Sequence, residues 1–88
     1  MSDIDYGQLN SLTARKLIRA LVRDGFVFTR QRGSHRRYQH PDGRQVTVPF
    51  TRSGGTFARG TLKSILERQA RWTKRDLRKL GLLKIIFK

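Results

Sequence analysis

A histidine next to a tight turn and among arginines has the chemistry to handle both a proton and a phosphate. It is His35, within the run Arg32-Gly33-Ser34-His35-Arg36-Arg37. Histidine has an unperturbed pKa of about 6.5, so its side chain exchanges protons near neutral pH. Arginine binds phosphate through paired hydrogen bonds, and a glycine turn lets the backbone approach a ligand closely. His35 is therefore either an acid/base group or a histidine at the rim of a basic surface.

The other residues whose side chains could take part in catalysis or binding have ordinary structural interpretations. His40 precedes the turn Pro41-Asp42-Gly43 and is predicted to be structural. The segment Ser53-Gly54-Gly55 lacks the Gly-Lys-Ser/Thr ending of a P-loop, so we interpret it as a flexible loop. The carboxylates are dispersed at expected helix ends and turns, and they offer no pair for two-metal phosphodiester cleavage: Asp24, Asp42, Glu67 and Asp76. We expect neither a cofactor nor a metal.

Charge dominates the composition. The 88 residues include 20 Lys and Arg against 6 Asp and Glu, which gives a formal charge of +14. Such a surface favours polyanions, so nucleic acid is the expected class of partner. The chain has no Cys, which excludes a disulfide scaffold and a Cys-based zinc site. No apolar run approaches the roughly 18–20 residues that span a bilayer, and the first residues do not resemble a signal peptide. We expect a cytoplasmic protein without a membrane segment.

The elements that position His35 can be predicted from periodicity and end signals. A helix is expected over Ala14–Asp24, with Thr13 as its N-cap and Gly25 after its end. At 100° per residue its core stripe contains Leu17, Ile18, Leu21 and Val22, with Ala14 beside them. A basic stripe lies nearly opposite and reads either as a solvated face or as a nucleic-acid contact: Arg15, Lys16, Arg19 and Arg23.

Three strands should follow this helix. The first starts with Phe26-Val27-Phe28-Thr29, the second is 35–40 and the third is 45–48, ending at Pro49. Val46 and Val48 are expected to face the helices, and Tyr38 is the apolar member of the second strand. If Tyr38 points inward, the period of two places three side chains on the free face: His35, Arg37 and Gln39.

Two further helices complete the prediction. The first begins with Thr61 as N-cap and has its apolar stripe on Leu62, Ile65, Leu66 and Ala70. A capping box at Thr73–Asp76 opens a short final helix that ends at Gly81. The chain therefore reads as one α+β domain, α-β-β-β-α plus a short C-terminal helix, with a three-stranded antiparallel sheet and helices on one face. Its core is 12–80, after a polar lead-in over 1–11 and before an apolar tail over 81–88.

The stretch from Leu12 to Leu80 resembles the HicA family of toxins from toxin–antitoxin systems. Order and spacing both match, and the Gly-Ser-His piece followed by Tyr and by Pro-Asp-Gly is the most specific part. The matching pieces are 14–21, 24–26, 31–38, 40–44, 46–49 and 60–66. The chain departs from the family in two ways, because it is longer at both ends and because Arg36 stands where a second His is common.

The resemblance implies a fold similar to double-stranded-RNA-binding domains and an activity as a ribosome-independent mRNA endonuclease. It also implies that His35 is the catalytic residue and that a HicB-type antitoxin covers the toxin. The residues around His35 would then bind RNA: Arg32, Gly33, Ser34, Arg36 and Arg37. The simplest route to cleavage is attack by the substrate's own 2′-hydroxyl, with His35 as acid or base and arginines stabilising the phosphorane.

Two alternative functions use the same residues for binding without catalysis. A non-catalytic double-stranded-RNA-binding module would use the basic helix faces and treat His35 as a ribose or phosphate contact. An accessory protein of a larger ribonucleoprotein would use its charge merely to coat RNA. The patterned helices and the turn at Pro41-Asp42-Gly43 argue against a coating tail.

Overall fold

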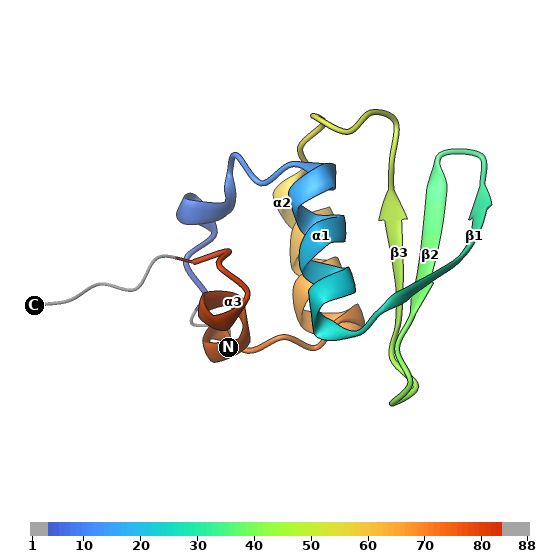
Figure 1. Cartoon of the computed structure of the whole chain (residues 1–88). Coiled ribbons are helices and arrows are strands. Elements are labelled where there is room, and N and C mark those ends of the chain that lie inside the picture. The colour runs from blue at the N-terminus through green and yellow to red at the C-terminus, as the bar shows by residue number, and fades with distance from the viewer. Residues whose placement is uncertain (1–3, 84–88) are drawn as a thin grey trace, which may run out of the picture.

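The computed structural model describes residues 4–83 and shows an α+β domain in which helices cover one face of a three-stranded sheet (Figure 1). The sheet is antiparallel with the strand order β1-β2-β3, as predicted. In Figure 1, α1 and α2 stand beside the sheet, and α3 lies on their far side. The elements are η1 (Tyr6–Leu9), α1 (Ala14–Asp24), β1 (Val27–Arg32), β2 (His35–Gln39), β3 (Gln45–Pro49), α2 (Arg59–Lys63), η2 (Ser64–Gln69) and α3 (Lys74–Lys79).

Helix α1 begins and ends where its capping residues predict. The Thr13 hydroxyl accepts a hydrogen bond from the Lys16 N–H at 3.2 Å, which satisfies one of the unpaired donors of the first turn. Gly25 adopts φ = 106°, a left-handed conformation that suits glycine, and its N–H donates to the Val22 carbonyl. The His40 ring gives a second reason for glycine at this position, because a Cβ added to Gly25 would lie 2.9 Å from His40 Nε2.

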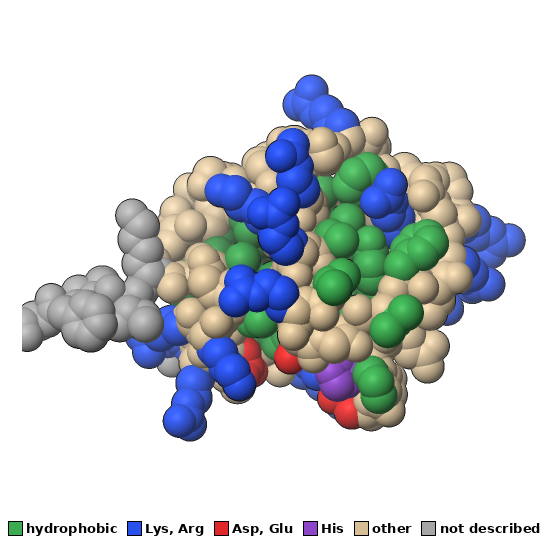
Figure 2. All heavy atoms as spheres, viewed as in Figure 1, with side chains coloured by type: hydrophobic (Ala, Val, Ile, Leu, Met, Phe, Trp, Pro, Cys, Tyr) green, Lys and Arg blue, Asp and Glu red, His purple; other side chains and the backbone are tan. Residues whose placement is uncertain are grey.

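The predicted core stripe of α1 is wrong at one position. Val22 is 56% exposed, although the helix buries Ala14, Leu17, Ala20 and Leu21. The reason is that α1 packs toward β3, so edge strand β1 extends beyond the helix layer. Phe28 on β1 is likewise half exposed and touches Tyr38 in a T-shaped arrangement. Figure 2 shows apolar side chains gathered on this side of the molecule.

The core otherwise follows the predicted pattern. Val46 and Val48 are fully buried, and Tyr38 is 3% exposed. Leu62, Ile65, Leu66 and Ala70 all lie in the same buried cluster. The inner face of the sheet is therefore the one expected from strand alternation.

The second helix begins earlier than predicted and changes its winding. Its first residue is Arg59, its N-cap is Ala58, and no side chain caps it, so Thr61 lies within the helix. From Ser64 the chain continues as the π-helical η2, with a bond from the Ala70 N–H to the Ile65 carbonyl. Gln69 thereby reaches Ser64 and also accepts a hydrogen bond from the Thr47 N–H at 2.8 Å. The π turn thus ties the helix to the edge of β3.

The segment predicted as a polar lead-in packs onto the fold. Residues 6–9 form the 3₁₀ turn η1, Leu9 is buried, and the Tyr6 hydroxyl donates to Glu67. Burial, and then the bond to Glu67, raise the pKa of Tyr6 above its ordinary value, so the phenol remains a donor at neutral pH.

At the other end of the chain, the capping box of Thr73 and Asp76 is present. It opens α3 as predicted, and Leu77 anchors this helix in the core. Leu83, in the tail, is also buried. The expected burial of Ile85, Ile86 or Phe87 lies outside the described residues.

Arg44 links three distant parts of the domain. Its guanidinium contacts Asp42 at 2.8 Å, Asp24 at 3.1 Å and the Ala70 carbonyl, and it lies over the Phe26 ring. Burial alone would raise the pKa of Asp42, but the hydrogen bonds from Arg44 outweigh it and lower that pKa. Arg44 therefore clamps the end of α1, the turn between β2 and β3, and the end of η2 together.

We expect the substitution Arg44→Met to lower the free energy of unfolding by about 1–3 kcal/mol, because it leaves the Ala70 carbonyl without the guanidinium donor and removes the ion pair with the partly buried Asp24. Urea denaturation followed by circular dichroism measures this change. The exposed Arg68 serves as control, since Arg68→Met should stay within about 0.5 kcal/mol of the parent. Equal stability of the parent and Arg44→Met would show that the clamp contributes nothing.

Candidate active site

The free face of the sheet carries His35, as the strand pattern predicts. His35 and Arg37 are exposed on the side of β2 opposite the buried Tyr38. Across the ladder to β3, Arg37 pairs with Thr47. Side chains that are directly opposite in an antiparallel pair have Cβ atoms about 5 Å apart. Thr47 therefore joins this face.

A β-bulge in β1 adds two arginines to the same face. Phe28 pairs with Tyr38 and points to the core side, whereas Arg30, two residues later, pairs with Arg37. The register therefore shifts at Thr29, whose hydroxyl donates to the Arg37 carbonyl at 3.1 Å. The extra residue turns Arg30 and Arg32 toward the His35 face, where regular alternation would have sent them to the other side.

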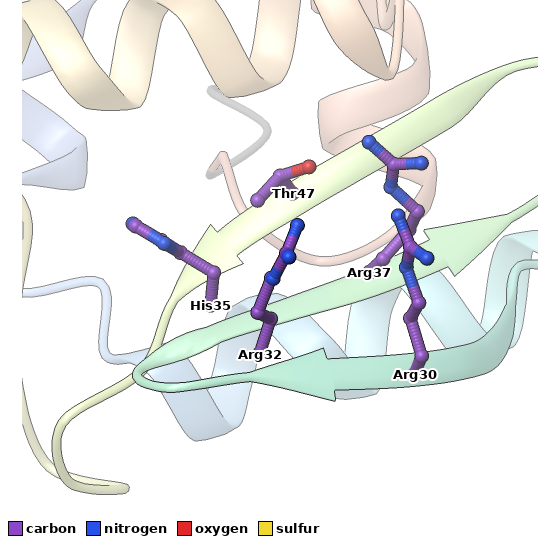
Figure 3. A pocket seen from close by; sticks show the side chains of 5 residues that line it. All are labelled: Arg30, Arg32, His35, Arg37 and Thr47. Atoms are coloured by element: carbon purple, nitrogen blue, oxygen red, sulfur yellow. The ribbon is translucent and has the colours of Figure 1, made fainter.

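These five side chains line one hollow. Figure 3 shows Arg30, Arg32, His35, Arg37 and Thr47 on the same side of the sheet, with the imidazole pointing away from the three arginines. The hollow has a volume of about 180 Å³. Within residues 4–83, none of these three arginines lies within ion-pair distance of a carboxylate. Three uncompensated guanidinium groups in one hollow favour a bound anion.

A second hollow adjoins the first and shares His35 and Thr47 with it. It reaches past β3 to the helix beyond, and its remaining walls are Pro49, Gly60, Thr61, Ser64, Ile65 and Gln69. The imidazole of His35 makes no hydrogen bond with any other residue in the described part of the chain. It therefore stands between an arginine-lined hollow and a neutral one, free to act on a ligand.

The structure does not bring Arg36 to this face. Arg36 pairs with Val48 on the core side of the sheet, and its guanidinium lies 3.6 Å from the centroid of the Phe50 ring. Its Nε is buried and makes no hydrogen bond among the described residues. Neighbouring residues of a strand point to opposite faces, so Arg36 and His35 cannot share a ligand on the free face.

Gly33 and Ser34 lie in the turn between β1 and β2, next to His35. Gly33 has φ = 58° and its carbonyl accepts from the Gln31 side chain. The Ser34 carbonyl accepts from the Phe50 N–H, and the Ser34 side chain is exposed. The turn thus presents backbone and a hydroxyl beside His35.

Two residues of the face were absent from the sequence prediction. Thr47 was within reach of pattern reasoning, because it lies between two strand residues that were correctly placed inward. Arg30 was not, since its orientation depends on the bulge at Thr29, which leaves no mark in the hydrophobic pattern.

His40 is structural, as predicted. Its Nε2 lies 2.8 Å from the Asp24 carbonyl, and Nδ1 accepts from the Asp42 N–H at 3.1 Å. The ring also meets Phe26 edge to face. The contact with the Asp24 carbonyl requires a hydrogen on Nε2, and Nδ1 also lies 3.0 Å from Asp42 Oδ1, so both ring nitrogens hold the turn against α1.

Two negative findings apply to residues 4–83. Their His, Asp and Glu side chains form no group of three that would hold a metal ion. No helix in that range has the length and apolar character needed to cross a membrane.

Comparison with known proteins places this geometry in a family. A model of the HicA toxin family of bacterial toxin–antitoxin systems matches residues 14–72. The matched range runs from the first residue of α1 to Trp72 and includes the whole sheet, both hollows and His35. No curated protein matches the chain significantly. On the strength of the family match, which spans more than half of the sequence, this chain belongs to the HicA toxins.

Proposed function

We propose that this chain is a ribosome-independent mRNA endoribonuclease that uses His35 as its acid/base group and is held inactive by a HicB-type antitoxin. One observation carries the proposal: an unengaged histidine stands beside three unpaired arginines on the open face of the sheet. The arginines suit the phosphates of RNA, and the histidine suits proton transfer at one of them.

The chemistry needs only the RNA itself as nucleophile. The 2′-oxygen attacks the adjacent phosphorus while His35 takes the 2′-hydroxyl proton, and the bond from phosphorus to the 5′-oxygen breaks. The leaving oxygen takes a proton from water, so the products end in a 2′,3′-cyclic phosphate and a 5′-hydroxyl. Arg30, Arg32 and Arg37 stabilise the negative charge that builds on the phosphorane. A positioned acid/base contributes about 10²–10⁴-fold, so a lone histidine predicts a slow enzyme.

Incubation of the purified chain with RNA tests the proposal, with the ends of any fragments identified by mass spectrometry. Fragments with cyclic phosphate ends, and resistance of a 2′-deoxy substitution at the cut position, are expected. Tight binding of RNA without fragments would instead identify a non-catalytic double-stranded-RNA-binding module.

The antitoxin is expected to be a HicB-type protein with an acidic surface that covers His35 and the arginines beside it. Charge complementarity should speed association to about 10⁸ M⁻¹s⁻¹ in low salt, and added salt should slow association more than it speeds dissociation. In the complex, modification of His35 by diethyl pyrocarbonate should be suppressed. His40, whose two ring nitrogens are already engaged, should show the low reactivity expected of a protected histidine and gives the internal reference. Full reactivity of His35 in an inhibited complex would show that inhibition acts at a distance.

A further inference from the structure

The two hollows beside His35 differ in chemistry. The hollow over the sheet is lined by three arginines, whereas the one toward α2 and η2 has His35 as its only ionisable side chain. The second hollow is also the larger, at about 430 Å³ against about 180 Å³. A phosphate belongs with the arginines, so the neutral hollow suits a different part of the ligand.

The walls of the neutral hollow combine apolar surface with neutral hydrogen-bonding groups. Pro49 supplies the accessible apolar part, since Ile65 is buried, and the hydroxyls of Thr61 and Ser64 supply the polar part. Small-molecule sites of a few hundred cubic ångströms have this mixed character. From the shared position of His35 we infer that this hollow is a nucleoside subsite. It takes the base and ribose next to the phosphate held by the arginines, an inference that rests on the proposed RNA substrate.

One hydroxyl is already oriented for such a ligand. The Ser64 oxygen lies 3.2 Å from Gln69 Nε2 and accepts its hydrogen bond, while Gln69 Oε1 is held by the Thr47 N–H. Ser64 therefore keeps its own hydrogen for an acceptor on the ligand. A base that presents an acceptor toward Ser64 should be preferred over one that presents a donor, so this subsite would contribute to cleavage specificity.

Gly60 provides a way to fill the hollow without touching His35 or the arginines. It lies in the first turn of α2, lines the hollow, and has no heavy atom within 4 Å of the place where a Cβ would stand. Gly54 is equally unobstructed but lies in the loop before α2, outside both hollows. Gly60→Leu and Gly54→Leu therefore form a matched pair of variant and control.

The experiment measures the affinity of each variant for two uncleavable oligomers by fluorescence anisotropy. One is a 2′-fluoro hexaribonucleotide, and the other has the same number of phosphates but abasic units. The parent and Gly54→Leu should prefer the base-bearing oligomer by about fivefold, the size expected from one net hydrogen bond to the base. Gly60→Leu should lose that preference and keep its affinity for the abasic oligomer. If Gly60→Leu retains the preference, or if its affinity for both oligomers falls by the same factor, the hollow holds no base.

A second measurement on the parent keeps the inference testable should Gly60→Leu fail to fold. At saturation with the base-bearing oligomer, nuclear Overhauser contacts are expected from base protons to the ring protons of Pro49 and the methyl group of Thr61, and their absence would overturn the inference. Both measurements are independent of cleavage. Base preference without cleavage would remove the nuclease proposal and leave the subsite as a base-binding site, whereas cleavage without base preference would remove the subsite alone.

Discussion

Replacement of His35 by alanine should slow RNA cleavage by about 10²–10⁴-fold and leave the fold unchanged, because His35 is the only acid/base group that residues 4–83 place on the free face. The side chain is exposed and makes no hydrogen bond within the described residues, so nothing in the core depends on it. RNA binding should fall only slightly, since the arginines remain. The measurements are single-turnover cleavage, anisotropy with RNA and thermal unfolding. Added imidazole should restore part of the activity of His35→Ala.

The chain's other histidine is the matched control. His40→Ala removes two hydrogen bonds and an edge-to-face ring contact, so it should lower the free energy of unfolding by about 1–3 kcal/mol. At a temperature where it remains folded, its cleavage rate should stay close to the parent's. If His35→Ala retained more than a tenth of the parent rate, another residue would have to carry the proton.

Arg37→Gln should slow cleavage by about 10- to 100-fold, because it removes one of the donors that face the developing charge on phosphorus. The same change should weaken RNA binding and reduce the salt dependence of binding, by about 0.7 in the slope for each lost single-strand phosphate contact. Cleavage rates and salt titrations of RNA affinity measure the two effects separately.

Arg36→Gln, one position earlier, is the comparison that makes this result specific. Arg36 lies on the opposite face over the Phe50 ring, so its loss should cost about 1–2 kcal/mol of stability and leave cleavage unchanged. The two variants have the same net charge. Equal loss of activity in both would mean that total charge matters and that the arrangement of the face does not.

Local signals were sufficient for much of the fold. The bounds of α1 follow from Thr13 and Gly25, and the start of α3 follows from the capping box, because these ends depend on hydrogen bonds between near neighbours. The burial of Val46, Val48 and Tyr38 follows from alternation along the strands. Since His35 has the opposite parity to Tyr38, the key position of the site was predictable as well.

The predictions from sequence fail where the position of one element depends on the placement of another. Val22 has the right helical phase for the core, but α1 packs toward β3 and leaves edge strand β1 beyond the helix layer, and helical periodicity cannot reveal this offset between layers. Thr61 is a good capping residue, yet the helix starts before it without a side-chain cap. The orientation of Arg30 depends on the bulge in β1. The neutral hollow depends on the π turn that brings Ser64 and Gln69 to β3. None of these features follows from local pattern.

Because of the bulge at Thr29, the charge of the free face depends on the number of residues in β1. Because one extra residue turns both Arg30 and Arg32 outward, a one-residue deletion there would move two positive charges to the other side of the sheet while the protein kept every arginine. A regular strand would need at least two substitutions to achieve the same change. The charge of this face is therefore more sensitive to the number of residues in β1 than to the loss of any single arginine.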